Sequence, residues 1–466
     1  MAERRYDVAV LGGGPGGYAA VLRAALRGAR VCCIESGQLG GTCLNAGCIP
    51  TKAMLHASGL FADCGHAAPM GIDIDGARVN GTTFMARIAD VTAGLRKGLG
   101  VLMNRRGVDV IAGRGRLAGP DRIEVAADGG TIEVAAGAII LATGSRPVRP
   151  RWLDWTCPHI LTTDEATRLP SLPESILIVG GGIIGCEFAT VYGELGVPTT
   201  VIELTDRLVP MLDETSARAV ALSLKKRKVL IHTGAKVRRV IPTEDGVAVE
   251  IDPGQTLQAA RVLVAVGREA NIDQIGLEEV GVETAGGVIR VDDRCRTNVD
   301  GIYAVGDAAE TRQYAHLAFR MGVVAADNAT GHDAADDRTV VPIGVYTHPE
   351  VAAVGMSEQR AVQHCRESGE ELKIGRFPYQ ASGLAQAQGR PVGEVRLFGD
   401  GRTGSLLGAV VIGYRATEVI QELALALRQG LTVADLAGTI HSHPTYVEAV
   451  GEAAETFLGL PLHWLG

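Results

Sequence analysis

The strongest regularity along the chain is a pattern of apolar and polar positions that occurs twice. Residues 6–35 and residues 175–203 each begin with a short apolar run, pass through closely spaced glycines into a segment with apolar residues at helical spacing, and end in a second apolar run closed by a glutamate. Short apolar runs bounded by turn residues predict buried strands, and apolar positions three and four apart predict an amphipathic helix. The pattern therefore predicts two βαβ units in one chain.

Each predicted unit has glycines at the same spacing in its first turn and an acidic residue at the end of its second strand. The two sets are Gly12, Gly14, Gly17 and Glu35, and Gly180, Gly182, Gly185 and Glu203. In a dinucleotide-binding turn the first glycine permits the tight turn, the second lets the backbone approach the pyrophosphate, the third lets the helix pack on the strand, and the acid binds ribose hydroxyls. A single motif can mark an ordinary turn, but two copies in this context predict two dinucleotide sites.

Apolar strands that end in glycine, and segments rich in turn residues, divide the chain further. A helical pattern covers residues 82–104, a proline-rich link covers 146–158, and strand and helix patterns alternate from residue 341 onward. The expected fold class is α/β, with two Rossmann-like dinucleotide-binding domains and a C-terminal α+β domain. The expected domains are residues 1–147, 148–268, 269–340 and 341–466.

Composition and charge mainly exclude classes of partner and of location. The chain has 466 residues, 46% of them hydrophobic, and a formal net charge of −8 with no strongly basic block, so a nucleic-acid partner is not expected. No apolar run approaches the roughly 18 residues of a membrane span, which predicts a cytoplasmic protein without a membrane partner. The nine cysteines are an odd number and a poor framework of structural disulfides, so most are expected to be reduced, and no metal site is expected.

Two of these cysteines stand in an unusual context. Cys43 and Cys48 lie in the glycine-rich segment 40–52, directly after the first predicted unit. The glycines permit a turn that brings the two thiols together, and a helix that starts near Cys48 would stabilise a thiolate there. Lys52 would lie about one turn along the same helix face. A permanent structural disulfide and two buried free thiols are the alternatives, but the adjoining dinucleotide site favours a redox-active pair.

A second group of candidate catalytic residues lies near the C-terminus. His443 precedes a proline that suits the start of a helix, and Glu448 follows about one turn later. A histidine oriented by a carboxylate is a common general acid or base near neutral pH. A hydrogen-bonded structural histidine is the alternative, and this cluster alone does not decide between them.

Together these segments resemble the flavin-dependent pyridine nucleotide-disulphide oxidoreductases. The resemblance covers essentially the whole chain and includes residues 142–144, 301–308 and 441–445. It implies a homodimer in which the first βαβ unit binds FAD, the second binds NAD, residues 269–340 complete the FAD site and residues 341–466 form the subunit interface. The further cofactor-binding residues that it implies are Lys52, Thr143, Gly144, Gly267 and Asp307.

The resemblance also implies roles for the thiols and for an ion pair. Cys43 would be the thiol that faces the substrate, and Cys48 the thiol beside the flavin. Lys52 would pair with Glu187, which follows the second glycine turn, near the reactive part of the flavin. For the isolated His316 the resemblance suggests a place near the flavin ring, with a plain hydrogen-bonded role in a helix at least equally possible.

Within the family, the segments are most similar to the members that oxidise dihydrolipoamide. This implies oxidation of protein-bound dihydrolipoyl groups by NAD, with a lipoyl-bearing carrier protein as partner and with His443 and Glu448 supplied to each active site by the partner subunit. Tyr446 and Val447 depart from the pattern expected after the histidine, and they bear on the shape of the substrate channel.

Other disulphide reductases of the family are the alternative functions. A glutathione-reductase-like enzyme would use NADPH, whose 2′-phosphate Glu203 would repel. A mercuric-reductase-like enzyme would carry a cysteine pair near the C-terminus, whereas the last cysteine here is Cys365. From another class, a catalytically silent scaffold would need neither the cysteine pair nor the histidine cluster.

Overall fold

The computed structural model describes residues 4–465, and its first domain is built on one large sheet. The strands of this sheet that come early in the chain are β1 (Arg4–Leu11), β2 (Val31–Glu35), β3 (Asp109–Ala112), β4 (Arg114–Gly119), β5 (Arg122–Ala127) and β6 (Gly130–Leu141). Their order is β3-β2-β1-β6-β5-β4, and β1 runs parallel to both of its neighbours. Helix α1 (Pro15–Leu26) connects β1 to β2, which gives the first βαβ unit that the sequence predicts.

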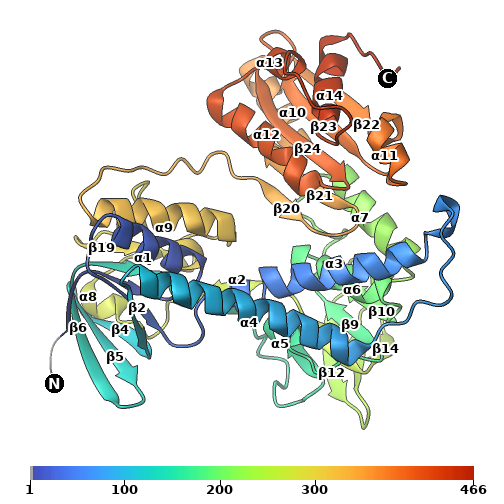
Figure 1. The fold of residues 1–466 in the computed structure, drawn as a ribbon. Coiled ribbons are helices and arrows are strands. Elements are labelled where there is room, and N and C mark those ends of the chain that lie inside the picture. Colours follow the sequence, from blue (N-terminus) through green and yellow to red (C-terminus); the bar gives the residue numbers. More distant parts are fainter. Residues whose placement is uncertain (1–3, 466) are drawn as a thin grey trace.

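The same sheet includes a strand from much later in the chain. β19 (Ile302–Ala304) pairs in parallel with β6, and α9 (Ala315–Ala329) packs along α1, as Figure 1 shows. The short elements of this part are β17 (Thr284–Ala285), β18 (Val288–Ile289), α8 (Leu277–Val280) and the 3-10 helix η2 (Gly306–Ala308). Of these, α8, β18 and η2 share one hydrophobic core with β1 and β2 through Leu277, Ile289 and Ala308. The segment that carries Asp307 thereby lies against the first glycine turn.

The second βαβ unit forms a separate parallel sheet of order β11-β10-β9-β15-β8. Its strands are β8 (Ile160–Thr162), β9 (Ile176–Val179), β10 (Thr199–Ile202), β11 (Leu230–His232) and β15 (Arg261–Val264). Its helices are α5 (Thr163–Ala166), α6 (Ile183–Glu194) and α7 (Glu214–Lys226). A small antiparallel sheet beside it consists of β12 (Val237–Pro242), β13 (Val247–Ile251) and β14 (Gln255–Ala259). The repeat seen in the sequence is therefore a repeat of structure.

Two connections between these domains run side by side. β7 (Ser145–Pro147) pairs antiparallel with β16 (Arg268–Ala270), so the chain leaves and returns through one short ribbon. The cysteine segment forms α2 (Gly41–Asn45) and α3 (Cys48–Cys64), followed by η1 (Ala68–Met70) and by α4 (Gly81–Arg105), the helix predicted at 82–104. Met54 of α3 and Ile88 of α4 share a core with Phe188 of α6. Figure 1 shows α3 and α4 reaching from the first domain across the second.

The C-terminal part is an antiparallel sheet of order β20-β21-β24-β23-β22, covered by helices. Its strands are β20 (Ile343–Val345), β21 (Glu350–Gly355), β22 (Leu372–Pro378), β23 (Glu394–Asp400) and β24 (Leu406–Gly413). Its helices are α10 (Glu358–Ser368), η3 (Tyr379–Ala381), α11 (Gly383–Ala387), α12 (Ala416–Gln429), α13 (Val433–Ala437) and α14 (Glu448–Leu458). In α12 the buried residues recur at helical spacing, as in Val419, Leu423 and Ala426. With this α+β unit the predicted fold class is confirmed.

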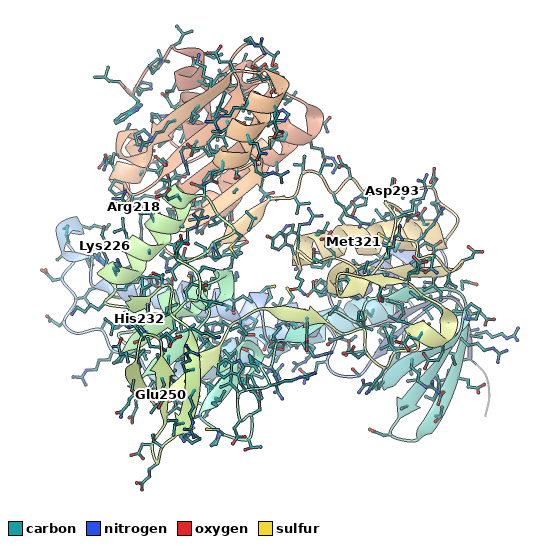
Figure 2. The ribbon with its side chains drawn as sticks, turned by 180° about the vertical axis from the view of Figure 1, so that it is seen from behind. Arg218, Lys226, His232, Glu250, Asp293 and Met321 are labelled. Carbon is teal, nitrogen blue, oxygen red and sulfur yellow. The ribbon has the colours of Figure 1, made fainter. Side chains whose placement is uncertain are left out.

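Four consecutive basic residues, 225–228, lie at the C-terminal end of α7. Lys225, Lys226 and Lys228 are exposed, and Figure 2 shows Lys226 on the outside of the molecule. Cations there interact favourably with the helix dipole. Among residues 4–465, no helix has the length and apolar character needed to cross a membrane.

Candidate active site

A large cavity connects the first glycine turn with the cysteine pair. Its volume is about 1890 Å³, well above that of an ordinary ligand pocket. The predicted site residues that line it are Gly12, Gly14, Glu35, Cys43, Cys48, Thr143, Gly144 and Asp307. The second glycine turn does not line this cavity. The structure thus places most of the expected FAD residues and the two thiols around one space, whereas Gly17 and Lys52 do not line it.

The glycines of the first turn are required by close backbone contacts. Gly12 has φ +106°, and a Cβ on it would lie 2.2 Å from the carbonyl oxygen of Ala142. A Cβ on Gly17 would lie 1.8 Å from the carbonyl oxygen of Gly12. Gly180 and Gly185 repeat these contacts in the second unit, at 2.3 Å and 1.9 Å. Both turns therefore bring bare backbone to the start of a helix, which is the arrangement that receives a pyrophosphate.

The two acidic residues occupy equivalent positions. Glu35 accepts hydrogen bonds from the backbone N–H groups of Gly13 and Gly37, both at 2.7 Å. Glu203 accepts from the Gly181 N–H at 2.6 Å and from the Thr205 N–H at 2.7 Å. Each carboxylate is therefore fixed at the end of its second strand, beside the turn where a ribose would lie.

Two polar groups on the cavity wall fit FAD. The Thr143 hydroxyl is buried and has no hydrogen-bond partner within residues 4–465, although it lines the cavity. Asp307 accepts a hydrogen bond from the Ser145 hydroxyl at 2.6 Å, and burial raises the pKa of this carboxyl against the opposing effects of Ser145 and Arg268. Buried polar groups of this kind need a polar partner, and the hydroxyl groups of a dinucleotide would supply one. The residues present therefore fit the cofactor.

The two thiols lie in hydrogen-bond contact, and their electrostatic surroundings differ. The hydrogen bond from Cys43 lowers the pKa of Cys48 despite burial, and Lys52 contributes in the same direction. The same hydrogen bond and burial raise the pKa of Cys43. Cys48 is the first residue of α3, so the helix N-terminus also favours its thiolate.

An ion pair lies one helical turn beyond Cys48. Lys52 donates to both carboxylate oxygens of Glu187, at 2.8 and 2.9 Å. Burial opposes the charge on Lys52, but Glu187 and Cys48 outweigh it and raise the pKa of the lysine. The Glu187 side chain is only 3% exposed, whereas the Lys52 side chain is 33% exposed, so the carboxylate is shielded from solvent and the lysine keeps partial access to it. The contact between α3 and α6 thus joins Lys52 and Glu187, the two residues that the family resemblance pairs.

The histidine cluster is formed, but it lies apart from the thiols within one chain. His443 Nδ1 lies 2.8 Å from Glu448 Oε2, and the His443 side chain is 79% exposed. Neither residue lines the cavity that holds Cys43 and Cys48. The dyad therefore faces outward on the C-terminal domain, where a second subunit can reach it.

Arg268 is a cavity residue that sequence reasoning missed. It donates to the Ser145 hydroxyl at 2.9 Å, to Asp164 at 3.0 Å and to Thr42 at 3.3 Å, and only 12% of its side chain is exposed. It thereby links the two connecting strands to the residue before Cys43. The available signal was its place directly after Gly267, at the end of a buried strand.

His316 and the six buried cysteines lie outside these two clusters. Burial lowers the pKa of His316, which stacks on Tyr314 with ring centroids 5.3 Å apart. The other cysteines deepest in the fold are Cys32, Cys33, Cys157, Cys186, Cys295 and Cys365. In the part of the chain that the structure describes, no group of three or more potential ligands could hold a metal ion.

Comparison with known proteins identifies the class to which this fold and site belong. The family described as pyridine nucleotide-disulphide oxidoreductase matches residues 6–322, and its dimerisation domain matches residues 341–454. The chain belongs to this family. It is an oxidoreductase that uses FAD and NAD, as predicted, and the dimerisation domain supports a homodimer.

Individual relatives narrow the comparison. The chain is 38% identical to a dihydrolipoyl dehydrogenase of Bacillus subtilis, over 98% of this chain and 99% of the relative. It is 39% identical to a dihydrolipoyl dehydrogenase of Halobacterium salinarum, over 98% of each chain. Among solved structures, LpdA from Mycobacterium tuberculosis matches with a TM-score of 0.89 and 30% identity, over 97% of this chain and 99% of LpdA. The HOCl-induced flavoprotein disulfide reductase RclA of Escherichia coli matches with a TM-score of 0.86 and 26% identity, over 97% and 99%.

Proposed function

We propose that this chain oxidises protein-bound dihydrolipoyl groups and passes the electrons to NAD. The observation that carries the proposal is the thiol pair, in which Cys48 is disposed to be the thiolate and Cys43 the thiol, on the wall of the cavity that the first glycine turn lines. The dihydrolipoyl dehydrogenases that resemble the chain over nearly its full length support this substrate class.

The dyad provides the base for the first step. Glu448 holds Nδ1 of His443 at 2.8 Å, which leaves Nε2 available to take a proton from a substrate thiol. The substrate thiolate attacks the sulfur of Cys43 in the Cys43–Cys48 disulfide, and Cys48 leaves as a thiolate. The second substrate thiol then attacks the mixed disulfide and displaces Cys43. Its proton ends on Cys43, the lipoyl disulfide closes, and the enzyme holds a Cys43 thiol and a Cys48 thiolate.

The chain's own residues prepare the second half of the reaction. When bound, FAD accepts the electron pair and supplies a hydride to NAD. α3 and the Lys52 ammonium keep negative charge on Cys48, and Glu187 fixes that ammonium. In the second domain, the glycine turn would receive the NAD pyrophosphate and Glu203 would bind its ribose hydroxyls.

The outward position of the dyad supports an active site shared between subunits. Because His443 is 79% exposed and does not line the cavity of its own chain, the proposal assigns it to the cavity of the partner subunit. The substrate dithiol would then bind between the two chains. A lipoyl-bearing carrier protein is the proposed partner. A cytoplasmic setting is proposed because the nine cysteines are a poor framework of structural disulfides. The proposed domains keep the boundaries 1–147, 148–268, 269–340 and 341–466.

An anaerobic assay of the purified protein tests this function. NAD with dihydrolipoamide is expected to give rapid NADH formation, whereas glutathione disulphide with NADPH is expected to give little turnover. The opposite preference would favour the glutathione-reductase-like alternative. Turnover with neither pair would contradict the proposed substrate class.

A further inference from the structure

The first hairpin of the C-terminal domain reaches the helices of the redox centre. The hairpin consists of β20, the turn at residues 346–349 and β21. Val345 and Val351 share a hydrophobic core with Met54 of α3 and Phe188 of α6. The turn between these strands is therefore held against the two helices that carry Lys52 and Glu187.

Tyr346, the first residue of this turn, contacts both members of the ion pair. Its backbone N–H donates to Glu187 Oε1 at 3.1 Å. The Nζ atom of Lys52 lies 4.3 Å from the centroid of its ring. An ammonium over the face of an aromatic ring is attracted by the ring quadrupole. Because Tyr346 is 37% exposed and the Lys52 side chain 33% exposed, this contact has the modest strength of a partly solvated pair. One residue therefore fixes the carboxylate through its backbone and the ammonium through its side chain.

A second contact of the same turn lies further from the thiols. His348 Nδ1 lies 2.8 Å from Glu194 Oε1, and Glu194 also accepts from the Ser58 hydroxyl at 2.7 Å and from Arg227 at 2.8 Å. Glu187 and Glu194 lie about two turns apart on α6, so they share one face of that helix. The turn is thus attached to α6 at two buried carboxylates. The inner contact is with Glu187, beside the redox centre, and the outer contact is with Glu194, further from the thiols.

We propose that Tyr346 is a positioning residue, whose ring and backbone N–H hold the Lys52 ammonium beside Cys48, while the contact of His348 with Glu194 only anchors the hairpin. The inference rests on the proposed roles of Lys52 and Cys48. It does not depend on which dithiol the enzyme oxidises.

The charged and titratable groups around Cys48 show how the Lys52 ammonium affects its thiolate. The titratable groups that face Cys48 are Cys43, Lys52, Glu187 and Tyr18. Those that face Tyr346 are Lys52, Glu187 and Glu350, and the Tyr346 side chain also contacts Thr417. Among these groups Lys52 is the cation, so displacement of its ammonium weakens the positive potential that favours the Cys48 thiolate.

The test uses the FAD-loaded enzyme with a Cys43→Ser background, so that Cys48 is the remaining thiol of the pair. The midpoint of Cys48 ionisation is measured against pH by its long-wavelength absorbance with oxidised flavin and by the rate at which iodoacetamide alkylates the Cys48 peptide. Tyr346→Leu is expected to raise the midpoint by about half a pH unit, the size expected for loss of a cation–π contact. Tyr346→Phe keeps the ring, removes only the hydroxyl and is expected to restore the original midpoint.

His348→Leu is the matched control from the same turn. It removes the outer contact, so it is expected to lower the melting temperature and to leave the Cys48 midpoint unchanged. The proposal is overturned if Tyr346→Leu leaves the midpoint in place, or if His348→Leu shifts it equally. Tyr346→Met, of similar volume, replaces the leucine variant if that variant loses FAD. Because no dihydrolipoyl substrate is used, a wrong substrate assignment would leave this result intact.

Discussion

Cys43 and Cys48 belong to one short segment, yet their surroundings separate their chemistry. Their mutual hydrogen bond lowers the pKa of Cys48, with help from Lys52, and raises that of Cys43. In the reduced pair the proton therefore stays on Cys43, and the charge stays at the start of α3. This distribution suits a thiol that exchanges with substrate and a thiolate that faces the cofactor.

Replacement of either thiol is expected to stop the disulfide cycle while FAD is retained. Anaerobic addition of NADH to the wild type should expose two further reactive thiols, because the pair is reduced. Neither Cys43→Ser nor Cys48→Ser should show this increase. Cys64→Ser, at the other end of α3, is the control and should behave as the wild type. An unchanged thiol count in the wild type would contradict a redox-active pair.

Glu203 is expected to determine the choice between NAD and NADP. Glu203→Ala removes an anionic acceptor for the ribose, so kcat/KM for NAD should fall by roughly tenfold or more. Glu203→Gln keeps an acceptor and removes the charge that opposes a 2′-phosphate, so its relative activity with NADP should rise. Steady-state kinetics with both nucleotides checks these changes, and a wild type that prefers NADP would show the assignment to be wrong.

Among the secondary-structure elements, those defined by local pattern could be predicted and those placed by distant contacts could not. The strand, glycine turn and helix of residues 6–26 follow each other directly, so their spacing appears in the sequence. The packing of α3 on α6 depends on Met54 and Phe188, which lie far apart along the chain. The pairing of β7 with β16 is equally long-range.

The same distinction holds within the site. The glycine turns, the thiol pair and His443 with Glu448 could be found because each set lies within a few residues. Lys52 and Glu187 were paired by resemblance, and the structure supplies their 2.8 Å contact. Arg268 and Tyr346 were missed because their partners lie far from them along the chain, so no local pattern marks them.

The start of α6 offers a test of the second glycine turn. A Cβ on Gly185 would lie 1.9 Å from the carbonyl oxygen of Gly180, so Gly185→Ala must displace the second glycine turn. NAD binding should weaken severely and stability should fall by about 1–3 kcal/mol, whereas FAD content should be retained. Gly98→Ala in α4 is the control, since its Cβ meets no atom within 4 Å and alanine favours a helix. Calorimetric NAD titration and thermal unfolding distinguish the two variants.

For the whole molecule, the shared active site predicts the activity of a hybrid dimer. One subunit carries both Cys43→Ser and His443→Ala, and the other is wild type. If the dyad acts on the partner's thiols, each site contains one lesion, and dihydrolipoamide oxidation should fall by roughly 10² to 10⁴. If each subunit used its own dyad, one site would be intact.

Differentially tagged subunits allow this hybrid to be purified and assayed beside both parent dimers. About half of the wild-type activity would contradict the shared site. The wild-type dimer carrying the same two tags is the control for any effect of the tags themselves.

The helices α3 and α4 come from the first part of the chain, but their apolar faces lie in a core shared with α6 and with the hairpin of the C-terminal domain. A segment exchanged between related genes would therefore have to preserve this shared core. A transplanted nucleotide-binding domain would have to fit against Met54 and Ile88 of its host. Chimeras that take α3, α4 and α6 from the same parent should yield folded protein more often than chimeras joined at the proline-rich link of residues 146–158, which separate these helices.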